Sequence, residues 1–227
     1  MSEPRVLVVI PAAGAGTRLG GDVPKQFRPL GGKPILLHVV ERFFVDERVT
    51  KIVVAVTEGL LGGVKQTERV HFVAGGATRQ QSVIHCLDGA TATDDFDLIA
   101  VHDAVRPFFR TATFHAVLDA AQEHGAALPA IPVTDTIHTV QDWAIAATLD
   151  RSTLAAAQTP QCFRAPILRE VLDRAAAEKI EGTDEAGLAT LFGYRVQVVP
   201  GDAMNFKITR PEDLELAAAH FEEWSQP

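Results

Sequence analysis

Short runs of apolar residues, rich in valine and isoleucine, alternate along the chain with stretches that have the period of an amphipathic helix. Five of these runs are apolar almost continuously, not at every second position: residues 5–10, 51–57, 69–74, 97–103 and 127–133. A continuous apolar run is typical of a strand that is buried on both faces of a sheet. The pattern therefore predicts a core of covered, mostly parallel strands.

Five further segments repeat their apolar residues at helical spacing: residues 34–44, 78–90, 111–125, 165–179 and 211–224. The first places Ile35, Val39 and Phe43 on one face, and we expect Pro34 at its first helical position. Strands that alternate with helices form a sheet wrapped on both faces. The sequence thus predicts one α/β domain over residues 1–227, Rossmann-like, with a mostly parallel twisted sheet.

Residues 134–151 break this alternation. Two short segments flank a turn that we place at Gln141-Asp142, with no helical segment between them, so a protruding β-hairpin arm is predicted. Trp143 and Ile145 in this arm would be costly to expose to water, which favours contact with a partner surface. A hairpin folded back on its own domain is the alternative.

The composition narrows the function. A formal charge of −8 argues against nucleic acid and anionic membranes as partners, and the sequence has no run of Lys and Arg to reverse this locally. Cys86 and Cys162 match no metal-binding or redox spacing and are expected to be reduced thiols. No segment is long and apolar enough to cross a bilayer, and the N-terminal run lacks a cleavage site, so a cytoplasmic location is expected.

The segment PAAGAGTRLGGDVPKQF, residues 11–27, follows the first apolar run directly. Gly14 and Gly16 allow backbone N–H groups to approach phosphate oxygens, and Arg18 and Lys25 add full positive charges. A loop of this composition suits a nucleoside triphosphate. A dinucleotide fingerprint is the competing interpretation, but Leu19 stands where its third glycine belongs. A purely structural glycine-rich turn is the other alternative.

This segment resembles the signature of the sugar-nucleotide-transferase-like fold and, more narrowly, of the 2-C-methyl-D-erythritol 4-phosphate cytidylyltransferase family of the non-mevalonate isoprenoid pathway. Later motifs match in the same order and cover nearly the whole chain: AGGATRQQSV, VHDAVRP, PVTDT, LDRSTL, QTPQCF, TDEA and NFKITRPEDL. The resemblance implies transfer of CMP from CTP to the phosphate of a sugar alcohol, with release of pyrophosphate. Stabilising negative charge is then the main catalytic task.

The resemblance also implies roles for individual residues. The catalytic residues would be Arg18, Lys25, Arg151 and Lys207. CTP would contact Pro11, Ala12, Ala13, Gly14, Ala15, Gly16, Arg18, Lys25, Gly76, Ala77, Ser82 and Asp103. The acceptor would contact Asp103, Arg106, Thr136, Arg151, Thr159, Thr183 and Lys207. Taken alone, Ser82 and Thr183 could be helix caps, and Asp103 a solvated loop residue. His102 is interpreted as structural.

The resemblance also implies Mg²⁺ or another divalent cation, for which Asp103 is the candidate ligand, with most of the coordination supplied by substrate phosphates. The arm would cross a homodimer, so that Thr136 and Arg151 serve the partner's site. Three positions depart from the expected pattern: Thr17, Ala77 and Val105. A ribitol-5-phosphate cytidylyltransferase and a CTP-binding module without catalytic activity remain as alternatives.

Overall fold

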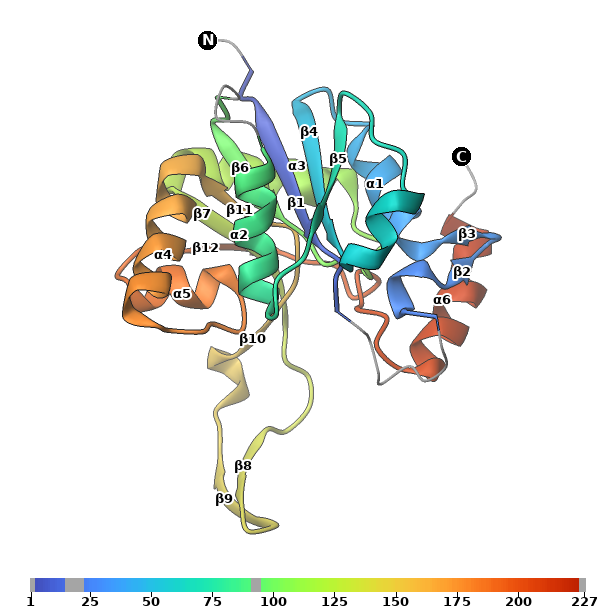
Figure 1. Ribbon diagram of the computed structural model, residues 1–227. Helices are drawn as coiled ribbons and strands as arrows, with labels where there is room; N and C mark the ends of the chain where they lie inside the picture. Colours follow the sequence, from blue (N-terminus) through green and yellow to red (C-terminus); the bar gives the residue numbers. More distant parts are fainter. Residues whose placement is uncertain (1–2, 15–22, 91–94, 225–227) are drawn as a thin grey trace.

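The computed structural model describes residues 3–14, 23–90 and 95–224 of the chain (Figure 1). Eight strands form the main sheet: β1 (Val6–Pro11), β4 (Val49–Val56), β5 (Val70–Ala74), β6 (Leu98–Val101), β7 (Ala126–Pro132), β10 (Ala155–Ala157), β11 (Gln161–Arg164) and β12 (Gln197–Pro200). Their order is β10-β7-β11-β6-β1-β4-β5, and β12 pairs with β7. Of these strands, β10 and β11 run against the others. The sheet is thus mostly parallel, as predicted.

Helices cover both faces of this sheet, in agreement with the prediction. One face is covered by α1 (Ile35–Phe43) and α3 (Thr111–His124), and the other by α2 (Arg79–Gly89), α4 (Ala165–Glu178) and α5 (Glu185–Leu191). Side chains of β1 alternate between the two cores. Val6 and Val8 pack with α1 and α3, whereas Leu7 and Val9 pack with α2 and α4. All four are fully buried, as a continuous apolar run requires.

The C-terminal helix α6 (Pro211–Trp224) lies beside the sheet instead of on it (Figure 1). It packs on the small hairpin of β2 (Pro29–Leu30) and β3 (Lys33–Pro34) and on a third apolar cluster that contains Phe108 and Ile208. Val105 and Phe108, which follow β6, belong to this cluster. The cluster therefore anchors the loop that begins at His102.

The chain order creates a switch point in the sheet. From β1 the chain moves outward to β4 and β5, and it then returns to form β6 on the other side of β1. The loops that follow β1 and β6 consequently diverge at the carboxyl end of the sheet. Ligands of open α/β sheets bind in the crevice at this position.

The arm protrudes from the body, as predicted (Figure 1). It contains β8 (His138–Gln141) and β9 (Ala144–Thr148), and every residue of both strands is exposed. The turn lies one residue later than expected, because Gln141 still pairs with Ala144 and the two loop residues are Asp142 and Trp143, both with positive φ. Two-residue hairpin loops of this type need positive φ at both positions. Trp143 is completely exposed in the single chain.

Other expectations are met or corrected at single residues. Ile35, Val39 and Phe43 are fully buried on one face of α1, but Pro34 caps the helix and does not begin it. Cys86 and Cys162 are free and buried, as expected, and burial raises the pKa of Cys86 to about 12. No helix in the described part of the chain is long and apolar enough to cross a membrane.

Candidate active site

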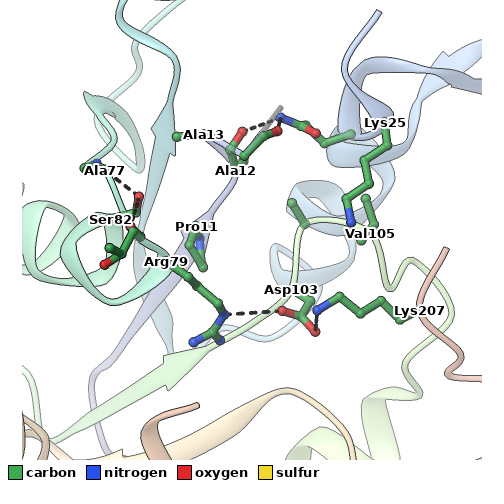
Figure 2. Close-up of a pocket in the computed structure, with 15 residues that line it drawn as sticks. Pro11, Ala12, Ala13, Lys25, Ala77, Arg79, Ser82, Asp103, Val105 and Lys207 are labelled. Carbon is green, nitrogen blue, oxygen red and sulfur yellow. Dashed lines mark hydrogen bonds and ion pairs between the residues drawn. The ribbon is translucent and has the colours of Figure 1, made fainter. Parts of the chain in front are cut away.

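A cavity of about 320 Å³ lies at the switch point, between the loops that follow β1 and β6 (Figure 2). It is also bounded by the N-terminal turn of α2 and by the short 3-10 helix Lys25–Phe27. This cavity brings together ten of the residues predicted from sequence: Pro11, Ala12, Ala13, Gly14, Lys25, Gly76, Ala77, Ser82, Asp103 and Lys207. Ala15, Gly16, Thr17 and Arg18 lie outside the described residues.

Asp103 is the electrostatic centre of the crevice. Its Oδ2 lies 3.0 Å from Lys207 Nζ and 3.1 Å from Arg106 Nε, and its Oδ1 lies 3.7 Å from Arg79 Nε. Burial alone would raise the pKa of this carboxyl, but the charges of Lys207, Arg79 and Arg106 outweigh it and hold the pKa well below its usual range. Figure 2 shows Arg79 and Lys207 approaching Asp103 from opposite sides. One carboxylate thus holds three cations at the crevice, which excludes the solvated-loop interpretation.

A second cavity, of about 170 Å³, adjoins the first and shares Arg79, Asp103 and Lys207 with it. Three residues predicted to contact the acceptor also line it: Arg106, Thr159 and Thr183. Among the described residues, the larger cavity therefore contains those predicted for CTP, and the smaller one contains most of those predicted for the acceptor. Their shared border consists of one carboxylate and two cations.

The segment before α2 is held by its own side chains. Thr78 is the N-cap of this helix and accepts a hydrogen bond from Gln81 N, so Ser82 is not the cap. The Ser82 hydroxyl accepts from Gly76 N at 3.1 Å and donates to Thr78 O at 3.0 Å. Ser82 is buried against the cavity and fixes the backbone of the predicted base pocket.

One helix cap near the smaller cavity also differs from expectation. The N-cap of α5 is Asp184, whose side chain accepts from Gly187 N, so Thr183 precedes the cap instead of forming it. Asp184 also accepts from Gln161 Nε2 at 2.7 Å, which fastens α5 to β11. Thr183 is consequently held at the cavity wall by the residues that follow it.

The arm residues do not reach either cavity within one chain. Thr136 and Arg151 are exposed, and neither lines the two cavities. Arg151 Nη1 instead donates to Thr134 O at 2.6 Å, which joins the two sides of the arm at its base. The structure of one chain therefore separates these two residues from the rest of the predicted site.

The structure also adds residues that the sequence did not single out. Arg79 lines both cavities, and its Nη1 donates to both carboxylate oxygens of Glu185, at 2.7 and 2.9 Å. The Glu185 side chain is 1% exposed. Gln26 donates to Ala12 O and Gly14 O and so ties the loop after β1 to the short helix that carries Lys25. In the sequence, the feature that could have indicated a role for Arg79 and Gln26 was their position inside the quoted motifs.

The described residues contain no group of three or more His, Cys, Asp and Glu that could hold a metal ion. Asp103 is the only predicted metal ligand, and its oxygens already face three cations. Mg²⁺ keeps several waters and commonly binds through one or two carboxylates together with substrate phosphates. The donor set therefore fits a Mg²⁺ ion that the triphosphate itself carries, and it does not fit a resident protein cage.

A crevice at the switch point of an α/β sheet, bordered by fixed cations, is typical of an enzyme that binds a nucleotide. The sequence model of the 2-C-methyl-D-erythritol 4-phosphate cytidylyltransferase family matches residues 6–223 of this chain. The chain belongs to this family and is a cytidylyltransferase, for which a divalent cation is generally expected.

Relatives of this chain carry the same description. The enzyme of Solibacter usitatus is 43% identical over 231 residues, which covers 94% of both chains. That of Geotalea uraniireducens is 41% identical and covers 95% of this chain and 96% of its own. The crystal structure of the Thermus thermophilus enzyme is similar with a TM-score of 0.79 at 36% identity, over 96% of this chain and 98% of that one. The crystal structure of the Francisella tularensis enzyme is similar with a TM-score of 0.83 at 30% identity, over 94% of this chain and 98% of that one.

Proposed function

We propose that this chain transfers the cytidylyl group of CTP to 2-C-methyl-D-erythritol 4-phosphate, giving 4-diphosphocytidyl-2-C-methyl-D-erythritol and pyrophosphate. Membership of the family supports this activity. The observation that carries the assignment of the site is the shared border of the two cavities, formed by Arg79, Asp103 and Lys207. A reaction between two phosphate-bearing molecules needs positive charge where they meet.

The reaction is a direct displacement. An oxygen of the acceptor phosphate attacks the α-phosphorus of CTP, a new P–O bond forms, and the bond to the pyrophosphate breaks. The acceptor phosphate is already ionised at neutral pH, so no general base is required. Lys25, and Arg18 outside the described residues, stabilise the negative charge that accumulates on the α-phosphoryl oxygens. Removal of one such donor typically costs about 10² to 10³ in rate.

Asp103 has an organising role in this proposal. It holds Arg106 and Lys207 within 3.1 Å of one oxygen, at the wall of the smaller cavity. Two cations fixed in this way are placed to receive a phosphate group without reorganisation. Asp103 also remains the one described carboxylate near the triphosphate, where a Mg²⁺ ion bound by CTP would neutralise phosphate charge. We expect the reaction to take place in the cytoplasm.

The arm supplies residues to a neighbouring subunit in this proposal. Thr136 and Arg151 do not reach the cavities of their own chain, and Trp143 and Ile145 are exposed near the tip. In a twofold dimer each arm would extend to the other subunit, so that its apolar tip is covered and Arg151 reaches the partner's acceptor site. The enzyme would then be a homodimer with two shared sites.

Mixing two inactive variants tests this arrangement. Arg151→Ala damages the arm, and Lys207→Ala damages the crevice. If Arg151 acts on the partner's site, dimers formed from both variants contain one intact site, and an equal mixture should recover about a quarter of wild-type activity. If Arg151 acts within its own chain, no mixture of the two variants regains activity. Sedimentation of each variant controls for loss of the dimer.

A pyrophosphate-release assay tests the activity itself. CTP, UTP and ATP are each combined with methylerythritol phosphate and with ribitol 5-phosphate. Turnover with CTP and methylerythritol phosphate alone supports the proposal, whereas a preference for ribitol 5-phosphate would move the chain to the related cytidylyltransferase. Binding of CTP without release of pyrophosphate would make it a binding module, and turnover only with UTP or ATP would overturn the base assignment.

A further inference from the structure

His102 directly precedes Asp103 in the loop that borders the crevice, and its side chain has no exposed surface. The ring packs against Phe43 and Phe109, with ring centroids 5.1 and 4.6 Å apart. Its Nε2 lies 3.0 Å from the carbonyl oxygen of Arg106, and its Nδ1 lies 3.0 Å from Thr159 Oγ1. Both ring nitrogens therefore have a hydrogen-bond partner in an otherwise aromatic environment.

These contacts determine where each proton lies. The Arg106 carbonyl can only accept, so Nε2 carries the hydrogen and donates it. The ring is fully buried between Phe43 and Phe109, and such an environment disfavours a charged ring, so the ring is neutral and Nδ1 is an acceptor. The Asp103 backbone N–H can only donate, and it does so to Thr159 Oγ1 at 3.0 Å. Thr159 must then donate its own proton to Nδ1.

The Thr159 hydroxyl is consequently committed to the protein on both sides. Its proton points to His102, and one of its lone pairs receives the Asp103 N–H. The residue is 5% exposed although it lines the smaller cavity. Thr159 therefore has no proton left to donate to an acceptor molecule. A direct contact in which this hydroxyl donates to the substrate would need that proton.

The two bonds hold the two ends of one turn. Thr159 fixes the backbone of Asp103, and His102 fixes the carbonyl of Arg106, three residues later. Arg106 Nη1 in turn donates to Asn205 O at 2.7 Å, and Asn205 Nδ2 donates to Thr159 O at 2.9 Å. The chain of bonds closes on itself, and Asn205 connects it to the segment that contains Lys207.

We propose that His102 and Thr159 are positioning residues, which hold the Asp103–Arg106 turn so that its carboxylate keeps the guanidinium in place for the acceptor phosphate, and that neither side chain touches substrate. This inference rests on the proposed function for what the turn does, but not for how it is held. A displacement of about 1 Å in a positioned group can lower a rate about 10²-fold. His102 and Thr159 thus set the geometry of the site without contacting the reacting groups.

The proton assignment is tested first on the free enzyme, without substrate. Nitrogen-15 NMR of labelled histidine, with His102 assigned by its loss in His102→Phe, should show a neutral ring with the hydrogen on Nε2 from pH 5 to pH 8. Thr159→Val should shift the Nδ1 signal towards that of an acceptor without a hydrogen bond. A hydrogen on Nδ1, or a charged ring in this range, would overturn the inference. These readings do not depend on which substrate the enzyme uses.

Kinetics then separate positioning from direct contact. Thr159→Val, which keeps the shape but removes the hydroxyl, should lower kcat/KM by about 10- to 100-fold, whereas Thr159→Ser should stay close to wild type. In the His102→Phe background, Thr159→Val should cause a clearly smaller loss than in wild type, because the hydroxyl has already lost His102 and holds only the Asp103 N–H. A loss in that background as large as the loss in wild type would show that the hydroxyl does not act together with His102 and would refute the proposal. If wild type itself fails to turn over, the proposed function fails, and the NMR result stands separately.

Discussion

The ion pair between Arg79 and Glu185 supports a sharp prediction about stability. Arg79 donates to both carboxylate oxygens of Glu185, whose side chain is almost completely buried. Water therefore cannot solvate this carboxylate if the guanidinium is removed. In Arg79→Met the carboxylate would be left without its cation. Breaking a buried ion pair from one side typically costs about 3 to 5 kcal/mol, and we expect the lower end because 28% of the Arg79 side chain is exposed.

The pH dependence of this cost has a definite sign. Burial already raises the pKa of Glu185, with the charge of Arg79 as the main opposing influence, so the pKa should rise further in Arg79→Met. A carboxyl whose pKa is raised by folding binds more protons in the folded state than in the unfolded state. Stability then falls as pH rises, by up to about 1.4 kcal/mol per pH unit between the unfolded and folded pKa values. The deficit of the variant should be largest at pH 8 and shrink towards pH 5.

Thermal melts of wild type and variant between pH 5 and pH 8 measure this effect. A loss of about 3 kcal/mol corresponds to roughly 6 to 12 °C for a chain of this size. Glu185→Gln, added to Arg79→Met, should recover much of the loss at pH 8 because no buried charge remains. Arg174→Met is the matched control. Its ion pairs with Glu170 and Glu178 are exposed and 3.8 to 3.9 Å long, and the change should cost less than about 1 kcal/mol. A deficit that is independent of pH, or that Glu185→Gln does not relieve, would refute the reasoning.

Three further outcomes are expected. Lys25→Ala should lower kcat about 10²- to 10³-fold in the pyrophosphate assay with an unchanged melting temperature; near-normal kcat would remove Lys25 from the catalytic group. Burial opposes ionisation of Asp46, but hydrogen bonds from Arg48 outweigh it and lower its pKa, so this stabilisation is present above the unfolded pKa. Asp46→Asn should therefore cost about 2 kcal/mol in denaturant at pH 7 and progressively less as pH falls below about 4. Gly31→Ala should destabilise the protein by about 1 to 3 kcal/mol in the same assay, because φ is +56° and a Cβ would lie 2.0 Å from Phe221; wild-type stability would show that α6 yields easily.

Much of the fold followed from the hydrophobic pattern, because the central strands are buried on both faces. The runs that became β1, β4, β5, β6 and β7 were all identified. The strands β10, β11 and β12 were missed, since each has only three or four residues and β10 consists of three alanines. Sequence spacing could not show that β11 would insert, antiparallel, between β6 and β7.

The site was predictable where its residues lie inside recognisable motifs that follow strands. Asp103 and Lys25 were found in this way, and the structure places both at the predicted crevice. The partner of Arg79 was not predictable, because Glu185 lies 106 positions away and the two meet only after α2 and α5 cover the same face. The proton arrangement around His102 likewise depends on Thr159, 57 positions away.

The base of the arm has a consequence for how this fold can change. Ala155 pairs directly with Pro132, so the polypeptide leaves the sheet and re-enters it at neighbouring points on adjacent strands. Residues 133–154 are in effect an extended loop inserted between two paired strands, and the entropic cost of closing such a loop grows only slowly with its length. Evolution, or a designer, can therefore lengthen, shorten or exchange the arm without changing the residues of the larger cavity.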